Sequence, residues 1–133
     1  MIEWFDHYSV GVSIIDEQHK KLIDIINKAI TAKQHNDRPE EISEILYDMT
    51  VYAYEHFKIE ESYMEKYEYP EYEFHKNEHT GFYIKTLVYN NRETKGGNQI
   101  TDDILEYLQQ WLVGHIQITD KKYTDCFNNN GLK

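Results

Sequence analysis

The chain has few of the residues that interrupt helices: two prolines and six glycines in 133 residues. Proline lacks a backbone N–H and glycine weakens helix interiors, so their scarcity leaves room for long, uninterrupted helices. A single cysteine, Cys126, excludes an internal disulfide and is typical of a reducing compartment. These features predict one helical domain of a cytoplasmic protein.

Basic charge and long apolar runs are also scarce. Lysine and arginine number 14 against 24 acidic residues, which gives a net charge of −10. Such a chain repels phosphate backbones and anionic membrane surfaces. No apolar run approaches the roughly 20 residues of a membrane span, and MIEWFDHYSV lacks the apolar region of a signal peptide. We therefore expect neither a nucleic-acid partner nor a membrane partner.

Four segments carry apolar residues at the helical spacing of three and four. Pro39 suits the first turn of the second helix, where its missing N–H does no harm, and Pro70 marks the break before the third. The polar stretch 90–99 is typical of a loop, and Thr101 is a candidate N-cap of the fourth helix. The four apolar stripes run from Ile15 to Ile30, Ile42 to Tyr67, Tyr72 to Leu87 and Ile104 to Thr119.

Short links between long amphipathic helices favour antiparallel neighbours. The predicted fold is therefore all-α: a single domain over residues 1–133 built as an up-down-up-down four-helix bundle. Within it we expect an N-terminal arm at 1–11, the bundle at 12–127 and a frayed tail at 128–133.

The stretch AYEHFKIEESYM (53–64) places His56 and Glu60 one turn apart on the stripe that faces the core, with Glu61 on the outer face. An ionised carboxylate in a core is costly unless a partner compensates its charge. His75 and His79 have the same spacing of four residues, so they also share a face. Glu60 and these histidines therefore need a common binding partner.

Five of the seven histidines fall on inner stripes, and each predicted helix supplies at least one. A lone inward histidine is more often an ordinary core residue, but five imidazoles in one core would leave many donors and acceptors unpaired. Bundle cores build metal sites from facing helices, so the joint pattern predicts a metal site. The five residues are His19, His56, His75, His79 and His115.

Asp120 follows His115 by five residues, which overshoots one turn of an ideal helix by about 140°. Either the helix loosens over 116–119, or Asp120 reaches inward from the helix end. On spacing alone, a surface position at the helix end is the favoured interpretation of this aspartate.

The ordered pattern H…HxxxE…HxxxH…HxxxxD, with the phrases VGVSIIDEQHKKL, YEHFKIEE, HKNEH and WLVGHIQITDKKY, resembles the hemerythrin family in its short, single-domain bacterial form. This resemblance implies two non-haem iron ions, bridged by two carboxylates and a solvent-derived oxygen. It assigns one iron to His75, His79 and His115, the other to His19 and His56, and the bridges to Glu60 and Asp120.

Two octahedral irons offer about twelve coordination positions, and this ligand set leaves one of them vacant, on the two-histidine iron. The resemblance implies that dioxygen binds there reversibly as a hydroperoxide, in an oxygen carrier, store or scavenger rather than an enzyme. A di-iron peroxidase, nitric-oxide reductase or oxidase, or an oxygen or iron sensor, could use the same centre. We expect a stand-alone monomer, and the sequence does not identify a protein partner.

Several residues around the ligands have expected supporting roles. The resemblance implies that Tyr123 covers the end of the site. Asp16 and Gln18 are candidates to orient His19, although a surface helix start explains them equally well. A dry apolar pocket would slow the loss of bound oxygen as peroxide, although ordinary core packing explains its residues equally well. The expected pocket wall consists of Phe57, Trp111, Leu112 and Ile116.

Overall fold

The computed structural model describes residues 2–35, 39–96 and 102–133. The described residues form helices and turns without a strand, which confirms the all-α class. The four long helices are α1 (Ser13–Gln34), α2 (Pro39–Lys66), α3 (Tyr72–Gly96) and α4 (Asp102–Gly114). Three short elements follow: a π-helical turn at His115–Thr119, a 3-10 turn at Asp120–Tyr123 and α5 (Thr124–Asn129).

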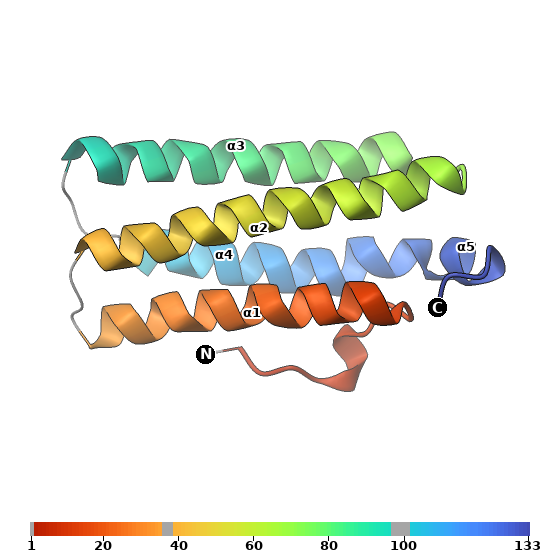
Figure 1. Cartoon of the computed structure of the whole chain (residues 1–133), viewed down its shortest axis with the longest axis horizontal. Coiled ribbons are helices and arrows are strands. Elements are labelled where there is room, and N and C mark those ends of the chain that lie inside the picture. Colours follow the sequence, from red (N-terminus) through yellow and green to blue (C-terminus); the bar gives the residue numbers. More distant parts are fainter. Residues whose placement is uncertain (1, 36–38, 97–101) are drawn as a thin grey trace.

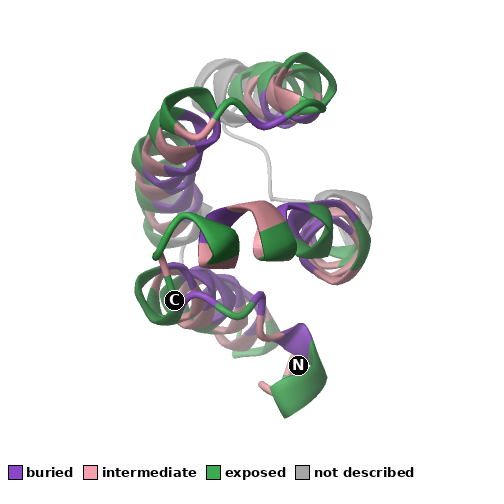
Figure 2. Cartoon of the chain, turned by 90° about the vertical axis from the view of Figure 1, so that its right-hand side faces the viewer, coloured by how far each residue is buried: buried purple, intermediate pink, exposed green. Residues whose placement is uncertain are grey.

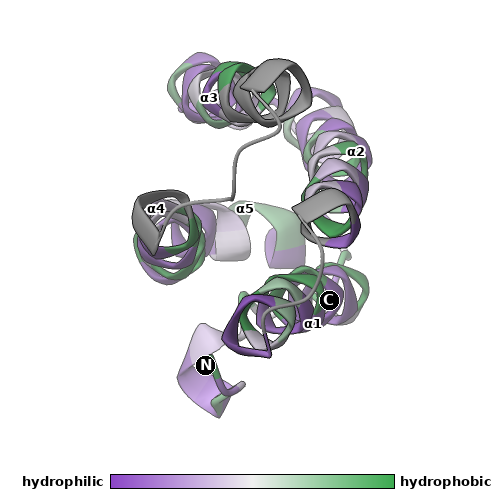
Figure 3. Cartoon of the chain, turned by 90° about the vertical axis from the view of Figure 1, so that its left-hand side faces the viewer, coloured by the Kyte–Doolittle hydropathy of each residue, from purple (hydrophilic) through white to green (hydrophobic). Residues whose placement is uncertain are grey.

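Successive long helices run in opposite directions (Figure 1). Viewed end-on, α2 lies between α1 and α3, and α4 lies between α3 and α1 (Figure 3). Helix α1 packs against both α2 and α4, and α2 packs against α3. The arrangement is the predicted up-down-up-down bundle.

Buried residues line the sides of the helices that face the bundle centre (Figure 2). On α1 they include Ile15, Leu22 and Ile26, each at most 1% exposed, and burying such a side chain contributes about 1.5–3 kcal/mol. Helix α3 differs, because Phe82 is the only apolar residue among its buried, described side chains. The other buried positions of α3 are His75, His79 and Thr86. Histidines thus make up two of the four buried positions described on α3.

The turn between α2 and α3 places the end of one helix beside the start of the other. Glu68 adopts a left-handed conformation with φ of 55°. The backbone N–H groups of Glu68 and Tyr69 donate to Glu65 and Met64, with N···O distances of 3.2 and 2.8 Å, which closes the last turn of α2. As predicted, α2 ends before Pro70 and begins at Pro39.

Two predictions need correction, one about the end of α3 and one about the C-terminal tail. Helix α3 continues to Gly96, through most of the stretch predicted as a loop, because no proline or glycine precedes Gly96 there to interrupt the helix. The predicted cap Thr101 lies outside the described residues. The tail is not frayed: Leu132 N–H donates to Phe127 and Gly131 N–H to Asn128, both at 3.0 Å, with φ of 91° at Gly131. This bonding pattern caps α5.

The N-terminal arm contains a 3-10 turn at Asp6–Tyr8. It is hydrogen-bonded to the first turn of α1 and to the start of α5. Val10 N–H donates to the Asp16 carboxylate at 2.9 Å, and Val10 O accepts from the Thr124 hydroxyl at 2.6 Å. Gly11 has φ of 73°, and a Cβ there would lie 2.8 Å from the Thr124 side chain. Asp16 therefore anchors the arm and, contrary to expectation, does not hydrogen-bond His19.

Candidate metal centre

The seven side chains predicted to bind metal come together in one half of the bundle. Because neighbouring helices are antiparallel, late α2 and the turn after α4 lie at the same level as early α1 and early α3 (Figure 1). All seven residues are at most 5% exposed. Their ligand atoms form two groups, each within 4.8 Å: His75, His79, His115 and Asp120, and His19, His56 and Glu60.

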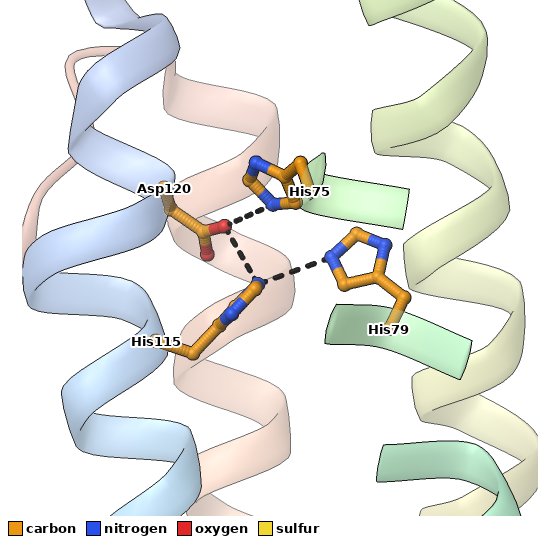
Figure 4. Close-up of side chains that lie close together, drawn as sticks. All are labelled: His75, His79, His115 and Asp120. Carbon is orange, nitrogen blue, oxygen red and sulfur yellow. Dashed lines mark hydrogen bonds and ion pairs between the residues drawn. The ribbon is translucent and has the colours of Figure 1, made fainter. Parts of the chain in front are cut away.

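The first group draws on α3 and the turns after α4. Asp120 Oδ1 lies 2.8 Å from His75 Nε2 and 3.0 Å from His115 Nε2. The Nε2 atoms of His79 and His115 are 3.1 Å apart, and all four side chains point toward one another (Figure 4). Two imidazole nitrogens at that distance repel unless a proton or a cation lies between them.

Each carboxylate faces both groups. Glu60 Oε1 contacts His56 Nε2 and lies 3.9 Å from His19 Nε2, while Oε2 lies 3.9 Å from His75 Nε2. Asp120 directs Oδ1 toward the first group and Oδ2 toward His19 Nε2, at 3.1 Å. Glu60 and Asp120 can therefore each bind a cation in both groups.

A local widening of the helix explains how Asp120 reaches the site. Residues His115–Thr119 form a π-helical turn, in which the Asp120 N–H donates to the carbonyl of His115. A π turn joins residues five apart, so Asp120 comes one turn after His115 on the same side. Of the three possibilities left open by the spacing, which were a loosened helix, a reach inward from the helix end and a surface position, the loosened helix is the one found.

The buried polar atoms of this region lack ordinary partners. Among the described residues, neither oxygen of Glu60 or Asp120 and neither ring nitrogen of His19 or His75 has a hydrogen bond of acceptable geometry, despite the short contacts. An unpaired buried polar group costs about 1–3 kcal/mol, and a charged one more. Cations would satisfy these convergent lone pairs together. Imidazole and carboxylate donors suit iron, so the residues fit a di-iron centre.

Protons compete with cations for the same nitrogens. Burial lowers the pKa of His19, but close contact with Asp120 and Glu60 outweighs it and raises the pKa to about 9. Burial opposes charge on His115 too, yet Asp120 and Glu78 raise its pKa to about 10. Although burial acts in the opposite direction, His56 and His19 hold the pKa of Glu60 below its ordinary range. His115, with His19 and His75, does the same for the pKa of Asp120. The carboxylates are therefore ionised and ready to bind a cation.

The family model described as "Hemerythrin HHE cation binding domain" matches residues 10–126. The chain belongs to the hemerythrin family.

Relatives agree with this assignment over most of the chain. The bacteriohemerythrin of Stenotrophomonas maltophilia is 30% identical over 94% of this chain and 80% of its own length. The bacteriohemerythrin of Clostridium acetobutylicum is 30% identical over 94% of this chain and all of its own length. A crystal structure of wild-type hemerythrin is 30% identical, covers 95% of this chain and 97% of its own, and superposes with a TM-score of 0.87. In this chain, none of the described helices is long and apolar enough to cross a membrane.

Aromatic rings pack against the three-histidine group of the hemerythrin site. Phe57 stacks on His79 with centroids 3.9 Å apart and planes 6° apart. Trp111 stacks on His115 at 4.3 Å and 12°. These contacts fix the orientation of both imidazoles. Phe57 and Trp111 therefore have a positioning contact in addition to their predicted place in an oxygen pocket.

The remaining predicted neighbours are buried as well. Leu112 and Ile116 are 3% and 1% exposed, and Leu112 precedes His115 by one helical turn. The Tyr123 ring stacks on His75 at 5.6 Å and 19°, and its hydroxyl is buried without a partner among the described residues. Burial, together with Glu60 and Asp120, raises the pKa of Tyr123. Tyr123 therefore remains a neutral group beside the site.

Hydrogen-bond partners on the outer side of the imidazoles were predicted only in part, because Gln18 was expected beside another histidine and Glu61 was not expected at all. Gln18 Oε1 accepts from His56 Nδ1 at 2.6 Å, so Gln18 orients His56 rather than His19. Glu61, predicted on the outer face, is buried, and its carboxylate accepts from His79 Nδ1 at 2.9 Å. Such bonds fix the tautomer that leaves Nε2 free to bind metal.

Proposed function

We propose that this hemerythrin binds dioxygen reversibly at a non-haem di-iron centre and serves as an oxygen carrier, store or scavenger. The observation that carries the proposal is the pair of buried carboxylates, Glu60 and Asp120, each with one oxygen toward each histidine group. His75, His79 and His115 would hold one iron, His19 and His56 the other, and Glu60 and Asp120 both. Two ferrous ions would supply two electrons and one vacant position for dioxygen. The hydroperoxide form implied by the resemblance stays a prediction.

The donor set favours binding over turnover. Five of the seven side chains are histidines, and neutral imidazoles stabilise the ferrous state more than anionic carboxylates do. Oxidising di-iron centres of bundle proteins use carboxylate-rich sites with paired Glu-x-x-His motifs, and this sequence contains no such motif. The imidazole-rich set therefore supports a carrier over an oxidase or peroxidase.

Reversible colour is the expected result of the decisive test. Protein loaded anaerobically with ferrous iron should be nearly colourless, gain visible absorbance in air and lose it again under argon over repeated cycles. Colour that appears once and does not bleach would favour the enzymatic alternatives. Metal analysis that finds zinc, or one iron per chain, would contradict the proposed centre.

Replacing Leu112 with alanine is expected to speed autoxidation to the ferric form, because a cavity in the apolar wall admits water beside bound oxygen. We expect an increase of roughly tenfold, at the low end of the effects seen on altering the surroundings of a metal. The measurement is the first-order decay of the oxygenated spectrum.

Leu108→Ala is the matched control for Leu112→Ala. Leu108 is 0% exposed, one turn farther from the ligands on the same helix, and its truncation costs a similar ~2–5 kcal/mol of stability. An equal increase in both variants would assign the effect to lost stability rather than to a pocket wall.

A further inference from the structure

The two histidine groups differ in the charge of their outer hydrogen-bond partners. In the three-histidine group, Glu61 Oε2 accepts from His79 Nδ1 at 2.9 Å. Glu78 Oε1 lies 3.4 Å from His115 Nδ1, and the Thr119 hydroxyl, 3.2 Å from both Glu78 oxygens, holds that carboxylate in place. Two of the three imidazoles thus face an anionic partner.

The two-histidine group has no such charge. His56 Nδ1 meets the neutral amide oxygen of Gln18 at 2.6 Å. His19 Nδ1 is buried and has no partner among the described residues. Both groups are otherwise alike in burial and share the same two carboxylates, so the outer partners are an independent source of asymmetry.

An anionic acceptor on Nδ1–H acts through the ring. It draws the proton toward itself, which raises the electron density on Nε2 and strengthens the bond from Nε2 to a cation. A neutral amide orients the ring but donates much less charge. Changes to such partners typically alter metal affinity by about 10- to 100-fold.

Lys58 reduces this asymmetry only slightly. Its ammonium lies 3.5 Å from Glu61 Oε1, the oxygen that does not bond His79. The Lys58 side chain is 53% exposed, so solvent screens its charge. Glu61 therefore still presents net negative charge to His79.

Building on the proposed di-metal centre, we infer that Glu61, Glu78 and Gln18 make the two cation positions unequal, so that a divalent cation fills the three-histidine position first and is held there more tightly. The three residues act through their histidines and are positioning residues.

The test uses the full-length, metal-free protein and cobalt(II) without oxygen. Calorimetry gives the two stepwise dissociation constants, and proton NMR counts the ring N–H signals shifted by the paramagnetic ion. At one equivalent we expect three shifted histidine N–H signals, and two more at the second equivalent. Five signals of equal intensity from the first additions onward would overturn the inference.

Substitutions that exchange glutamate and glutamine separate the effect of the outer partners from the effect of having three histidines rather than two. Glu61→Gln should raise the first dissociation constant by about 10- to 100-fold and leave the second nearly unchanged. Gln18→Glu should lower the second constant by roughly tenfold. The matched controls are Glu65→Gln and Gln34→Glu, which make the same charge changes at exposed positions.

Two results would overturn the role of the outer partners. One is a Glu61→Gln variant whose first dissociation constant equals that of Glu65→Gln, or whose two binding steps are weakened equally. The other is a Gln18→Glu variant whose second dissociation constant equals that of Gln34→Glu. This second test remains valid if Glu61→Gln folds poorly, because a folding defect cannot raise affinity. Cobalt binding involves no dioxygen, so failure here would leave reversible oxygenation to be judged by its own spectral test.

Discussion

Removal of the metal with a chelator is expected to lower the melting temperature of the protein by on the order of 15 °C. A ligand present at a thousand times its dissociation constant stabilises the fold by about 4 kcal/mol, and each kcal/mol shifts the melting temperature by about 2–8 °C. The loss should concentrate in α3, because Phe82 is the only apolar residue among its buried, described side chains. Scanning calorimetry measures the shift, and amide hydrogen exchange locates it.

The size of this shift should depend on pH. The pKa values of His19 and His115, about 9 and about 10, are raised above the ordinary histidine value. Their charged contacts therefore stabilise the metal-free fold below pH 6.5 and lose that effect as the pH rises through 9 to 10. Metal binding strengthens over the same range, since it no longer displaces protons. The difference between the two melting temperatures should widen as the pH rises; equal melting temperatures at every pH would contradict a buried centre.

Asp120→Asn is expected to weaken binding at both cation positions and to abolish it at one or both. The substitution keeps the shape of the side chain but replaces one carboxylate oxygen with an amide NH2, which cannot bind a cation. Because the two oxygens face different histidine groups, either orientation of the amide removes one bridge end and the full negative charge. We expect metal content to fall from two ions per chain to one or none, as measured by elemental analysis after gel filtration.

Asp125→Asn provides the matched control for this change. Asp125 is exposed in α5, five residues after Asp120, so the same loss of charge occurs without contact with the ligands. Two tightly held ions in Asp120→Asn would show that this residue does not bridge. A comparable loss in Asp125→Asn would assign the effect to net charge.

Helix spacing accounts for most of what could be predicted. Because side chains three and four residues apart share a helix face, the stripes identified the inner positions of His19, His56, His75, His79 and His115, and all five are buried. Antiparallel order then placed them at one level. The end of α3 was missed because a polar composition does not by itself exclude a helix, and only backbone bonding distinguishes a helix from a loop.

The outer partners could not be found in this way. Gln18 bonds a histidine on α2, and Glu78 approaches one in the turn after α4, so each contact crosses between helices and leaves no spacing within one segment. Glu61 lies on the edge of the α2 stripe, where a small rotation of the helix decides between solvent and His79. Its place directly after Glu60 in the sequence was the only available signal.

The amino-acid sequence by itself determined the helices, their inward faces and the order of the seven candidate ligands, because these follow from local periodicity and from the absence of residues that break helices. The tertiary structure alone decided that Asp120 turns inward through a π-helical turn and which carboxylates and amides bond the outer side of each imidazole. Those features depend on the rotation and packing of neighbouring helices, which are set by contacts between segments far apart in the chain.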